Sequence, residues 1–240
     1  MNSLSSPAIE ARGLVKSFGN TKVLRGLNFR VGKGVTLAIF GPNGAGKTTL
    51  IKTLASVMRP TSGQVFIDGL DLKEHAQEAR GHLGLVSHQS YLYGALSAEE
   101  NLVFYGRMYG VAEPRERTRE ILSLVGLTAR RHDRAATFSR GMLQRLSLGR
   151  ALIHKPSILM LDEPETGLDP QALASMWDIL RHDAPSRTII FTSHNFERAL
   201  AVANEAIVLG RGKIAWSAQG DVLTLTSLSE AYVHTTGEHP

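Results

Sequence analysis

Short apolar runs alternate with longer amphipathic stretches along this chain, a pattern that indicates an α/β fold. Residues 35–40, 158–161 and 188–193 are apolar and short, as expected for buried strands. Between residues 170 and 180 the apolar side chains instead recur at helical spacing, after an Asp169-Pro170 pair that is typical of a helix start. Because strands and helices alternate in the second half of the chain, we expect a mostly parallel, doubly wound sheet.

Two regions depart from this alternation. Residues 8–34 have the pattern of short strands separated by glycine turns, which predicts an N-terminal antiparallel β layer. From about residue 91 to 135 the strand signals stop, and residues 99–109 and 115–125 have helical spacing. The sequence therefore predicts a single domain over residues 1–240, with an α/β core and an inserted helical subdomain. The expected bounds are 8–90 and 151–236 for the core and 91–150 for the helical subdomain.

The composition is that of an ordinary globular protein, with 42% hydrophobic and 20% charged residues. No apolar run approaches the ~18 residues that a membrane-spanning helix needs. The first residues lack the basic and apolar segments of a secretory signal, so we expect none. The absence of cysteine excludes disulfides and thiolate metal sites and is typical of a cytosolic protein.

The positive charge of the chain is concentrated in one segment. The net charge is +5, and residues 107–150 hold ten arginines and only four acidic residues. One interpretation is a surface facing anionic lipid, nucleic acid or a nucleotide held by a partner. The interpretation we favour is a solvated helical face, with Arg115, Arg117 and Arg119 pointing to water.

A glycine-rich loop follows the apolar run at residues 35–40. Residues 41–49 fit the pattern G-x-x-x-x-G-K-[ST], and Leu50, Ile51, Leu54 and Val57 follow at helical spacing. A strand, a glycine-rich loop and a helix in this order form a phosphate-binding site, whereas a simple glycine turn would lack these flanks. We therefore predict that the chain binds a nucleoside triphosphate. The residues expected to hold it are Gly41, Pro42, Asn43, Gly44, Ala45, Gly46, Lys47, Thr48 and Thr49.

The residues of this loop have distinct expected roles. Gly41, Gly44 and Gly46 let the backbone curl so that successive N–H groups point inward. Lys47 would reach the β and γ phosphates, and the Thr48 hydroxyl would ligate Mg²⁺.

Polar side chains follow three of the predicted strands. Asp162 and Glu163 come after residues 158–161, and since neighbours on a strand face opposite sides, the two acids should differ in role. We expect Asp162 to hold Mg²⁺ through a water and Glu163 to polarise the water that attacks the γ phosphate. Without the phosphate loop, two solvated loop charges would be an equally good interpretation. His194 follows residues 188–193 and could donate a hydrogen bond to the γ phosphate.

Gln89 ends the strand predicted over residues 83–89. Its carbonyl oxygen could ligate Mg²⁺ or water. Because Gln89 adjoins the helical insertion, it could also change position with the nucleotide state and so signal that state to the helical subdomain.

A second anion site is predicted at residues 138–145. They open a helix that carries Leu146, Leu148, Ala151 and Leu152, and a serine hydroxyl with a glycine N–H at a helix start can bind an anion. The chain has two phosphate-binding ends but one nucleotide loop, so the second is expected to act across a dimer.

In these motifs the chain resembles the ATP-binding subunits of ABC transporters, from about residue 8 to 236. The motifs of that family occur here in order: Phe18 as the adenine-stacking aromatic, Gly41–Thr48 as Walker A, Gln89 as the Q-loop, Ser139–Met142 as the signature, Leu159–Glu163 as Walker B, Gly167–Asp169 as the D-loop and His194 as the switch histidine.

The resemblance implies a P-loop NTPase that hydrolyses ATP with Mg²⁺. It implies a head-to-tail dimer with a second copy or a paralogous subunit, around two nucleotides, and integral membrane permease partners that dock near the Q-loop cleft and the helical lobe. The protein would lie in the cytoplasm on the inner face of the cell membrane, with no nucleic acid partner. Contacts to the nucleotide of the other subunit are expected from Ser139, Arg140, Gly141, Met142 and Asp169.

The signature departs from the family pattern, because L-S-G-G-Q is replaced by Phe138-Ser-Arg-Gly-Met142. Ser139 and Gly141 are kept, whereas Arg140 and Met142 change their surroundings.

The sub-type follows from weaker likenesses. Residues 104–110, the signature and residues 228–233 resemble exporter ATPases, including those assigned to haem export in cytochrome c maturation. We expect an exporter, and importers that depend on a binding protein are the alternative within the family.

Two other functions compete. A soluble ABC ATPase acting on nucleic acid or ribosomes would usually carry two cassettes or long coiled-coil insertions, which this chain lacks. A regulatory subunit that does not hydrolyse ATP is disfavoured because all the catalytic motif residues are present.

Overall fold

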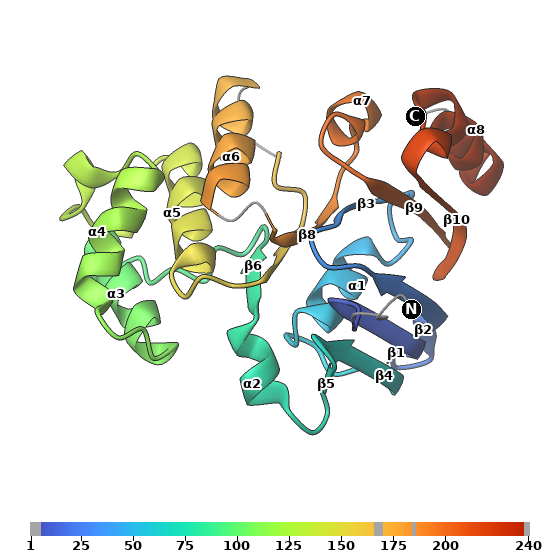
Figure 1. Ribbon diagram of the computed structural model, residues 1–240, viewed down its shortest axis with the longest axis horizontal. Helices are drawn as coiled ribbons and strands as arrows, with labels where there is room; N and C mark the ends of the chain where they lie inside the picture. The colour runs from blue at the N-terminus through green and yellow to red at the C-terminus, as the bar shows by residue number, and fades with distance from the viewer. Residues whose placement is uncertain (1–5, 166–169, 184–185, 238–240) are drawn as a thin grey trace, which may run out of the picture. The chain divides into compact units, whose positions relative to one another are not determined.

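The structure is a computed structural model that describes residues 6–165, 170–183 and 186–237 (Figure 1). It divides into two compact units. The first comprises Met1–Leu83, Ser157–Pro164 and Ser186–Pro240, and the second comprises Gly84–Pro156 and Glu165–Pro185. In the described part of the chain, no helix has the length and apolar character that crossing a bilayer requires.

The first unit begins with an antiparallel sheet. Its strands lie in the order β2-β1-β4-β5, and every neighbouring pair is antiparallel. Gly19, in the left-handed region with φ 55°, forms the turn between the first two strands. The predicted N-terminal β layer is therefore confirmed. Its strands are β1 (Ile9–Phe18), β2 (Thr21–Val31), β4 (Ser62–Ile67) and β5 (Leu70–Asp71).

A mostly parallel sheet follows in the same unit. The order within the unit is β10-β9-β3-β8-β7, and only the β10–β9 pair is antiparallel. The central strands are almost entirely buried, as expected for a parallel sheet covered on both faces. The parallel sheet predicted from the sequence is confirmed. Its strands are β3 (Thr36–Phe40), β7 (Ile158–Leu161), β8 (Thr188–Thr192), β9 (Glu205–Gly210) and β10 (Lys213–Gln219).

Helices cover this parallel sheet on both faces. Figure 1 shows α1 on one face and α7 and α8 on the other. Helix α1 contacts both β8 and β2, so it lies between the two sheets, and α8 packs on β9, β10 and α7. The helices of the unit are α1 (Lys47–Leu54), α2 (Ala76–Gly81), α7 (Phe196–Leu200) and α8 (Leu225–Thr236).

The first helix is shorter than the sequence predicted. Leu50, Ile51 and Leu54 are buried on one face as expected, but Val57 lies beyond the end of the helix and is 47% exposed. Ser56 adopts a left-handed conformation with φ 59°, which a helix cannot continue through.

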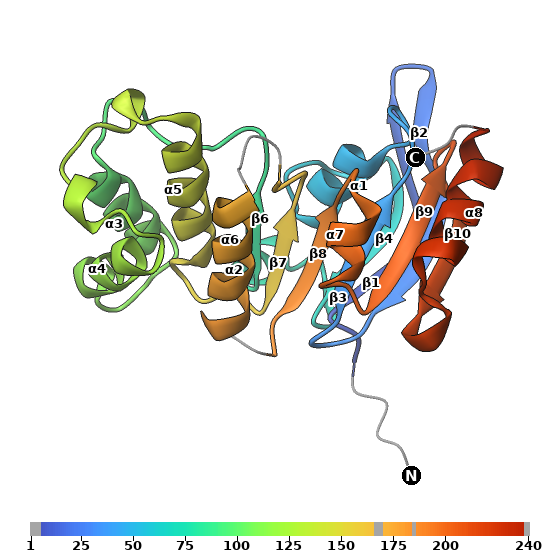
Figure 2. The ribbon, with the colours of Figure 1, turned by 90° about the horizontal axis from the view of Figure 1, so that it is seen from above.

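The second unit is helical and contains its own core. Figure 2 shows α3, α4 and α5 together, and each of these helices contacts the other two. The packing is close: a Cβ added to Gly149 of α5 would lie 2.8 Å from Ile121 Cγ2 of α4. Ser97 and Glu100 form a capping box at the start of α3. The helices are α3 (Ala98–Met108), α4 (Pro114–Leu124), α5 (Arg140–Leu152) and α6 (Pro170–Asp183).

Two further expectations are wrong. Strand β6 (Leu83–Val86) ends three residues before Gln89, which therefore lies in a loop and not at a strand end. The loop starts early because the Ser87 hydroxyl bonds the Gln89 carbonyl at 3.0 Å. Arg117 does not point to water, since its guanidinium donates to the carbonyls of residues 152 and 153 at 3.1 and 3.2 Å. Arg115 and Arg119 are exposed, as predicted.

Candidate functional site

The glycine-rich loop between β3 and α1 has the backbone that a phosphate site needs. Gly41, Gly44 and Gly46 have φ values of 145°, 79° and 103°, a region that other residues rarely adopt. At Gly41 space is also limiting, because an added Cβ would lie 2.4 Å from the Leu209 carbonyl oxygen. The loop closes into α1 through a bond from the Leu50 N–H to the Gly46 carbonyl at 2.8 Å. The positive end of α1 thus points toward the loop.

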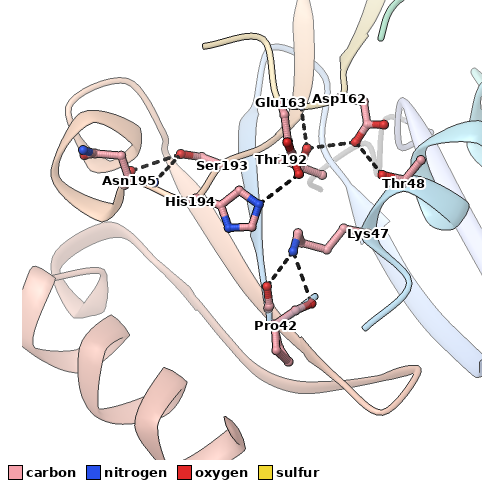
Figure 3. Close-up of polar contacts among 10 residues, drawn as sticks. Pro42, Lys47, Thr48, Asp162, Glu163, Thr192, Ser193, His194 and Asn195 are labelled. Atoms are coloured by element: carbon pink, nitrogen blue, oxygen red, sulfur yellow. Dashed lines mark hydrogen bonds and ion pairs between the residues drawn. The ribbon is translucent and has the colours of Figure 1, made fainter. Parts of the chain in front are cut away.

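Lys47 is buried inside this loop, with only 6% of its surface exposed. Its Nζ donates to the carbonyl oxygens of Gly41 at 2.6 Å and of Pro42 at 3.3 Å (Figure 3). Burial lowers the pKa of Lys47, and the negative charges of Glu163 and Asp162 act in the opposite direction. A cation held in this way, with carbonyls as neutral partners, can exchange them for anionic oxygens of a ligand.

Asp162 lies at the carboxyl end of β7, where two hydroxyl groups hold one of its oxygens. Its Oδ1 accepts hydrogen bonds from Thr48 Oγ1 and Thr192 Oγ1, each at 3.1 Å. Its Oδ2 is buried and lacks a hydrogen-bond partner. Leaving such an oxygen unpaired costs free energy, which a cation or a cation-bound water would offset.

Mg²⁺ suits this arrangement. It binds through hydroxyl and carboxylate oxygens and takes most of its remaining ligands from water and phosphate. Thr48 and Asp162 therefore fit Mg²⁺. Within the described residues no cluster of three or more histidine or acidic side chains forms a metal site made of protein alone.

Glu163 and His194 form a pair at the same edge of the sheet. His194 Nε2 lies 2.9 Å from Glu163 Oε1, and the Glu163 side chain is 21% exposed (Figure 3). The two adjacent acids have different partners, Thr48 for Asp162 and His194 for Glu163, whereas their roles stay a prediction. Glu163 adopts a left-handed φ of 51°, a strained conformation of the kind found at functional sites.

Thr192, at the end of β8, organises both acids and was not identified from the sequence. It is fully buried; its Oγ1 accepts the Glu163 N–H at 2.8 Å and donates to Asp162 Oδ1. Its signal in the sequence is a hydroxyl at the end of an apolar run, but that signal does not show which strand lies beside it. Residues 193–195 then form a turn in which Asn195 caps α7, which fixes His194 between strand and helix.

Phe18 is the last residue of β1. Its ring is 48% exposed, and Lys16 Nζ lies 5.1 Å from the ring centre. An exposed ring beside a cation is suited to stacking on a planar ligand. Its assignment to adenine stays a prediction.

The remaining predicted residues belong to the second unit or lie outside the described residues. Ser139 caps α5, since its Oγ accepts the Met142 N–H at 3.3 Å, so the predicted helix start is confirmed. Arg140 begins this helix, and a Cβ added to Gly141 would meet nothing within 4 Å. Gln89 is exposed in its loop. Asp169, with the whole segment 167–169, falls outside the described residues.

Comparison with known proteins gives a consistent result. Residues 24–166 match the family described as "ABC transporter". The chain is 32% identical to the linearmycin resistance ATP-binding protein LnrL of Bacillus subtilis (strain 168), over 94% of this chain and 77% of that protein. It is 36% identical to a Nod factor export ATP-binding protein I of Ralstonia nicotianae (strain ATCC BAA-1114 / GMI1000), over 92% of this chain and 70% of that protein.

A solved structure gives the same result. It is described as an ATP binding subunit of an ABC transporter and superimposes with a TM-score of 0.87 at 28% identity, covering 95% of this chain and 99% of that one.

Proposed function

Since this chain belongs to the ABC transporter family and is one of its ATP-binding, ATP-hydrolysing subunits, we propose that it drives an exporter through a separate membrane permease. The observation that carries the ATPase part of the proposal is the cluster of Asp162, Glu163 and His194 at one edge of the sheet, with Lys47 and Thr48 at the start of α1. Export is supported by the relatives, one of which is named for Nod factor export and another for linearmycin resistance.

In the proposed mechanism, the loop N–H groups and Lys47 bind the phosphates. Lys47 releases the Gly41 and Pro42 carbonyls and pairs with the β and γ phosphates. Thr48 and Asp162 would hold Mg²⁺, which would supply positive charge to offset that of the phosphates. The role of Gln89 as a further oxygen ligand for Mg²⁺ stays a prediction.

Glu163 and His194 would act on the transferred phosphoryl group. Glu163 accepts the proton of the attacking water, and its N–H bond to Thr192 keeps the carboxylate in place. His194 Nε2 leaves Glu163 Oε1 and donates to the γ phosphate. Their 2.9 Å pairing holds both groups at the same edge of the sheet.

A dimer completes the proposed site. The Ser139 end of α5 presents the first-turn N–H groups of Arg140 and Gly141, which can bind the γ phosphate held by a second copy or a paralogous subunit. Binding of two Mg·ATP closes the dimer, and hydrolysis reopens it, which drives the permease between two states.

The test of this cycle is Glu163→Gln, with Glu165→Gln as the matched control two residues away. Glu163→Gln should bind Mg·ATP, lose turnover by about 100-fold or more, and elute as a dimer in light-scattering chromatography. Glu165→Gln should hydrolyse ATP at a rate close to the wild type. Turnover of Glu163→Gln near the wild-type rate would refute the catalytic role, and a monomer in saturating Mg·ATP would refute the dimer.

The second unit offers a docking surface for the permease. A groove of about 940 Å³ between α3 and α4 exposes Phe104 and Met108, by 41% and 56%, beside Arg107, Arg115 and Arg119. Glu99 and Glu100 also line the groove, but its three arginines outnumber them. Apolar side chains beside an excess of arginine fit an acidic segment that carries an apolar anchor. We propose that the permease supplies this segment and holds the subunit on the cytoplasmic face of the membrane.

The double variant Arg115→Glu/Arg119→Glu tests the docking surface. It should lose co-purification with the permease while ATP binding by the isolated subunit is unchanged. A control pair, Arg130→Glu/Arg131→Glu, reverses the same charge outside the residues that line the groove. Equal loss with both pairs would contradict the docking site. Tight duplex binding with a steep salt dependence would favour a nucleic-acid ATPase instead.

A further inference from the structure

Arg150 is a buried cation in the helical unit. It lies on α5 with 7% of its surface exposed, and no carboxylate in the described part of the chain lies within ion-pair distance of it. Burial lowers the pKa of Arg150, but a guanidinium stays protonated even so. A buried charge without a counter-ion is costly, so its neighbours must account for it.

Its neighbours are one carbonyl group and two aromatic rings. The Nη2 group donates to the Leu85 carbonyl, and the guanidinium carbon lies 5.4 Å from the ring centres of both Tyr91 and Tyr105. The Nε atom is buried and has no hydrogen-bond partner. The cation is therefore held by a charge-assisted hydrogen bond and by two ring faces.

These contacts bracket the Gln89 loop. Leu85 precedes Gln89 by four residues and Tyr91 follows it by two, so one guanidinium fixes both ends of the loop to α5. Ser147, one turn before Arg150 on the same helix, donates to the Ser90 carbonyl at 3.4 Å and adds a third attachment.

The backbone of Tyr91 is strained, so the conformation of the Gln89 loop depends on contacts with its surroundings. Tyr91 adopts φ 55°, which is strained for a large side chain and needs support from its surroundings. Tyr105 supplies part of that support, since its hydroxyl donates to the Tyr91 carbonyl, and Arg150 covers the Tyr91 ring.

We infer that Arg150 is a positioning residue that makes the Gln89 loop and the Ser139 end of α5 move as one body. Ser139 caps the helix on which Arg150 lies, and a helix of this length transmits a displacement along its axis with little bending. A shift of Gln89 on nucleotide binding therefore reaches Ser139 through α5. This inference rests on the proposed roles of Gln89 and Ser139.

The experiment is amide hydrogen exchange on the full chain without nucleotide, comparing the wild type with Arg150→Lys. Lysine keeps the charge but lacks the planar group that spans a carbonyl and two rings. The amides of Leu92 and Tyr93, which bond Ser90 Oγ and Asn101 Oδ1, should exchange about 10- to 100-fold faster. The amides of α4 should be unchanged.

Two further variants separate positioning from general destabilisation. Thr118→Val changes another buried side chain of the same unit and should leave the Leu92 and Tyr93 amides unchanged. Tyr105→Phe removes only the hydroxyl on the Tyr91 carbonyl and should accelerate the same two amides by about 10-fold. Tyr105→Phe also keeps the inference testable if Arg150→Lys does not fold.

Steady-state kinetics supply the functional measurement. Arg150→Lys should lower kcat for ATP hydrolysis by about 10-fold with KM for ATP within about twofold, because the phosphate loop is untouched. Unchanged exchange at Leu92 and Tyr93, or equal acceleration across α4, would reduce Arg150 to a core residue. Faster exchange with an unchanged kcat would refute positioning. Failure of the proposed function can be told apart from failure of this inference, because the proposed function is tested by turnover and dimer formation of Glu163→Gln.

Discussion

Replacement of Thr192 by valine tests how the two acids are held. The substitution keeps the shape of the side chain and removes its hydroxyl, which accepts the Glu163 N–H at 2.8 Å and donates to Asp162 Oδ1 at 3.1 Å. Thr192 is fully buried, so no water replaces these bonds without rearrangement. The cost is about 2 kcal/mol, from the unpaired N–H of Glu163 and the loss of one bond to a charged oxygen. In a chain of this size that lowers Tm by about 4–8 °C.

Thr188→Val is the matched control, at the other end of the same strand. Thr188 is 2% exposed; its hydroxyl accepts the Gly34 N–H at 2.9 Å and donates to the Gly32 carbonyl at 3.4 Å. The two variants therefore lose similar hydrogen bonds from similar burial, but only Thr192 contacts the acids. We expect a comparable fall in Tm from both.

Turnover should separate the two variants. Phosphate release is measured with saturating Mg·ATP at a temperature well below both Tm values. Thr192→Val should lower kcat about 10- to 100-fold, because Asp162 and Glu163 both lose an anchor, whereas KM changes little. Thr188→Val should stay within about twofold of the wild type. A Thr192→Val enzyme with wild-type kcat, or an equal loss in both variants, would refute the reasoning.

Three other predictions concern the loop, the antiparallel sheet and the helical unit. Gly41→Ala should weaken ATP binding at least about 10-fold, because its Cβ would overlap the Leu209 carbonyl; Gly44→Ala, with open space around it, should lose less, as titration with a fluorescent nucleotide would measure. Arg12, with Arg30, lowers the pKa of Glu10 from 4.5 to about 2. The ionised Glu10 therefore stabilises the folded state fully above about pH 4.5, and this stabilisation is lost as the pH falls toward 2. The Tm difference between the wild type and Glu10→Gln should therefore be constant at neutral pH and shrink in acid; a constant difference down to pH 2 would contradict it. Thr118→Val should leave Tm unchanged or raise it, because the buried hydroxyl of Thr118 has no partner, and a fall of several degrees in a melting curve would show otherwise.

The features predicted correctly from the sequence are those encoded by neighbouring residues. The phosphate loop and the helix start at Ser139 each depend on a few consecutive positions, and the structure contains both. The apolar runs at β7 and β8 likewise specify buried strands by themselves. The exporter assignment came from resemblance and agrees with the relatives' names, whereas the haem sub-type stays a prediction.

The features missed depend on residues that are far apart in the chain. The pairing of Glu163 with His194 and the role of Thr192 require β7 and β8 to be neighbours, which no local pattern specifies. Gln89 was misplaced for a different reason, since Ser87 ends the strand through a hydroxyl bond that resembles an ordinary polar strand position in sequence.

The arginine-rich segment shows why a charge pattern alone misassigned part of a surface. The last carbonyls of α5 have no partner within the helix, and Arg117 of α4 donates to those of Leu152 and Ile153. Arg150 likewise donates a hydrogen bond to the Leu85 carbonyl. Two of the ten arginines thus hold α5 in place, one at its C-terminal end and one along its length. These two contacts attach α5 to its neighbours away from the Ser139 end, which is the end proposed to bind an anion.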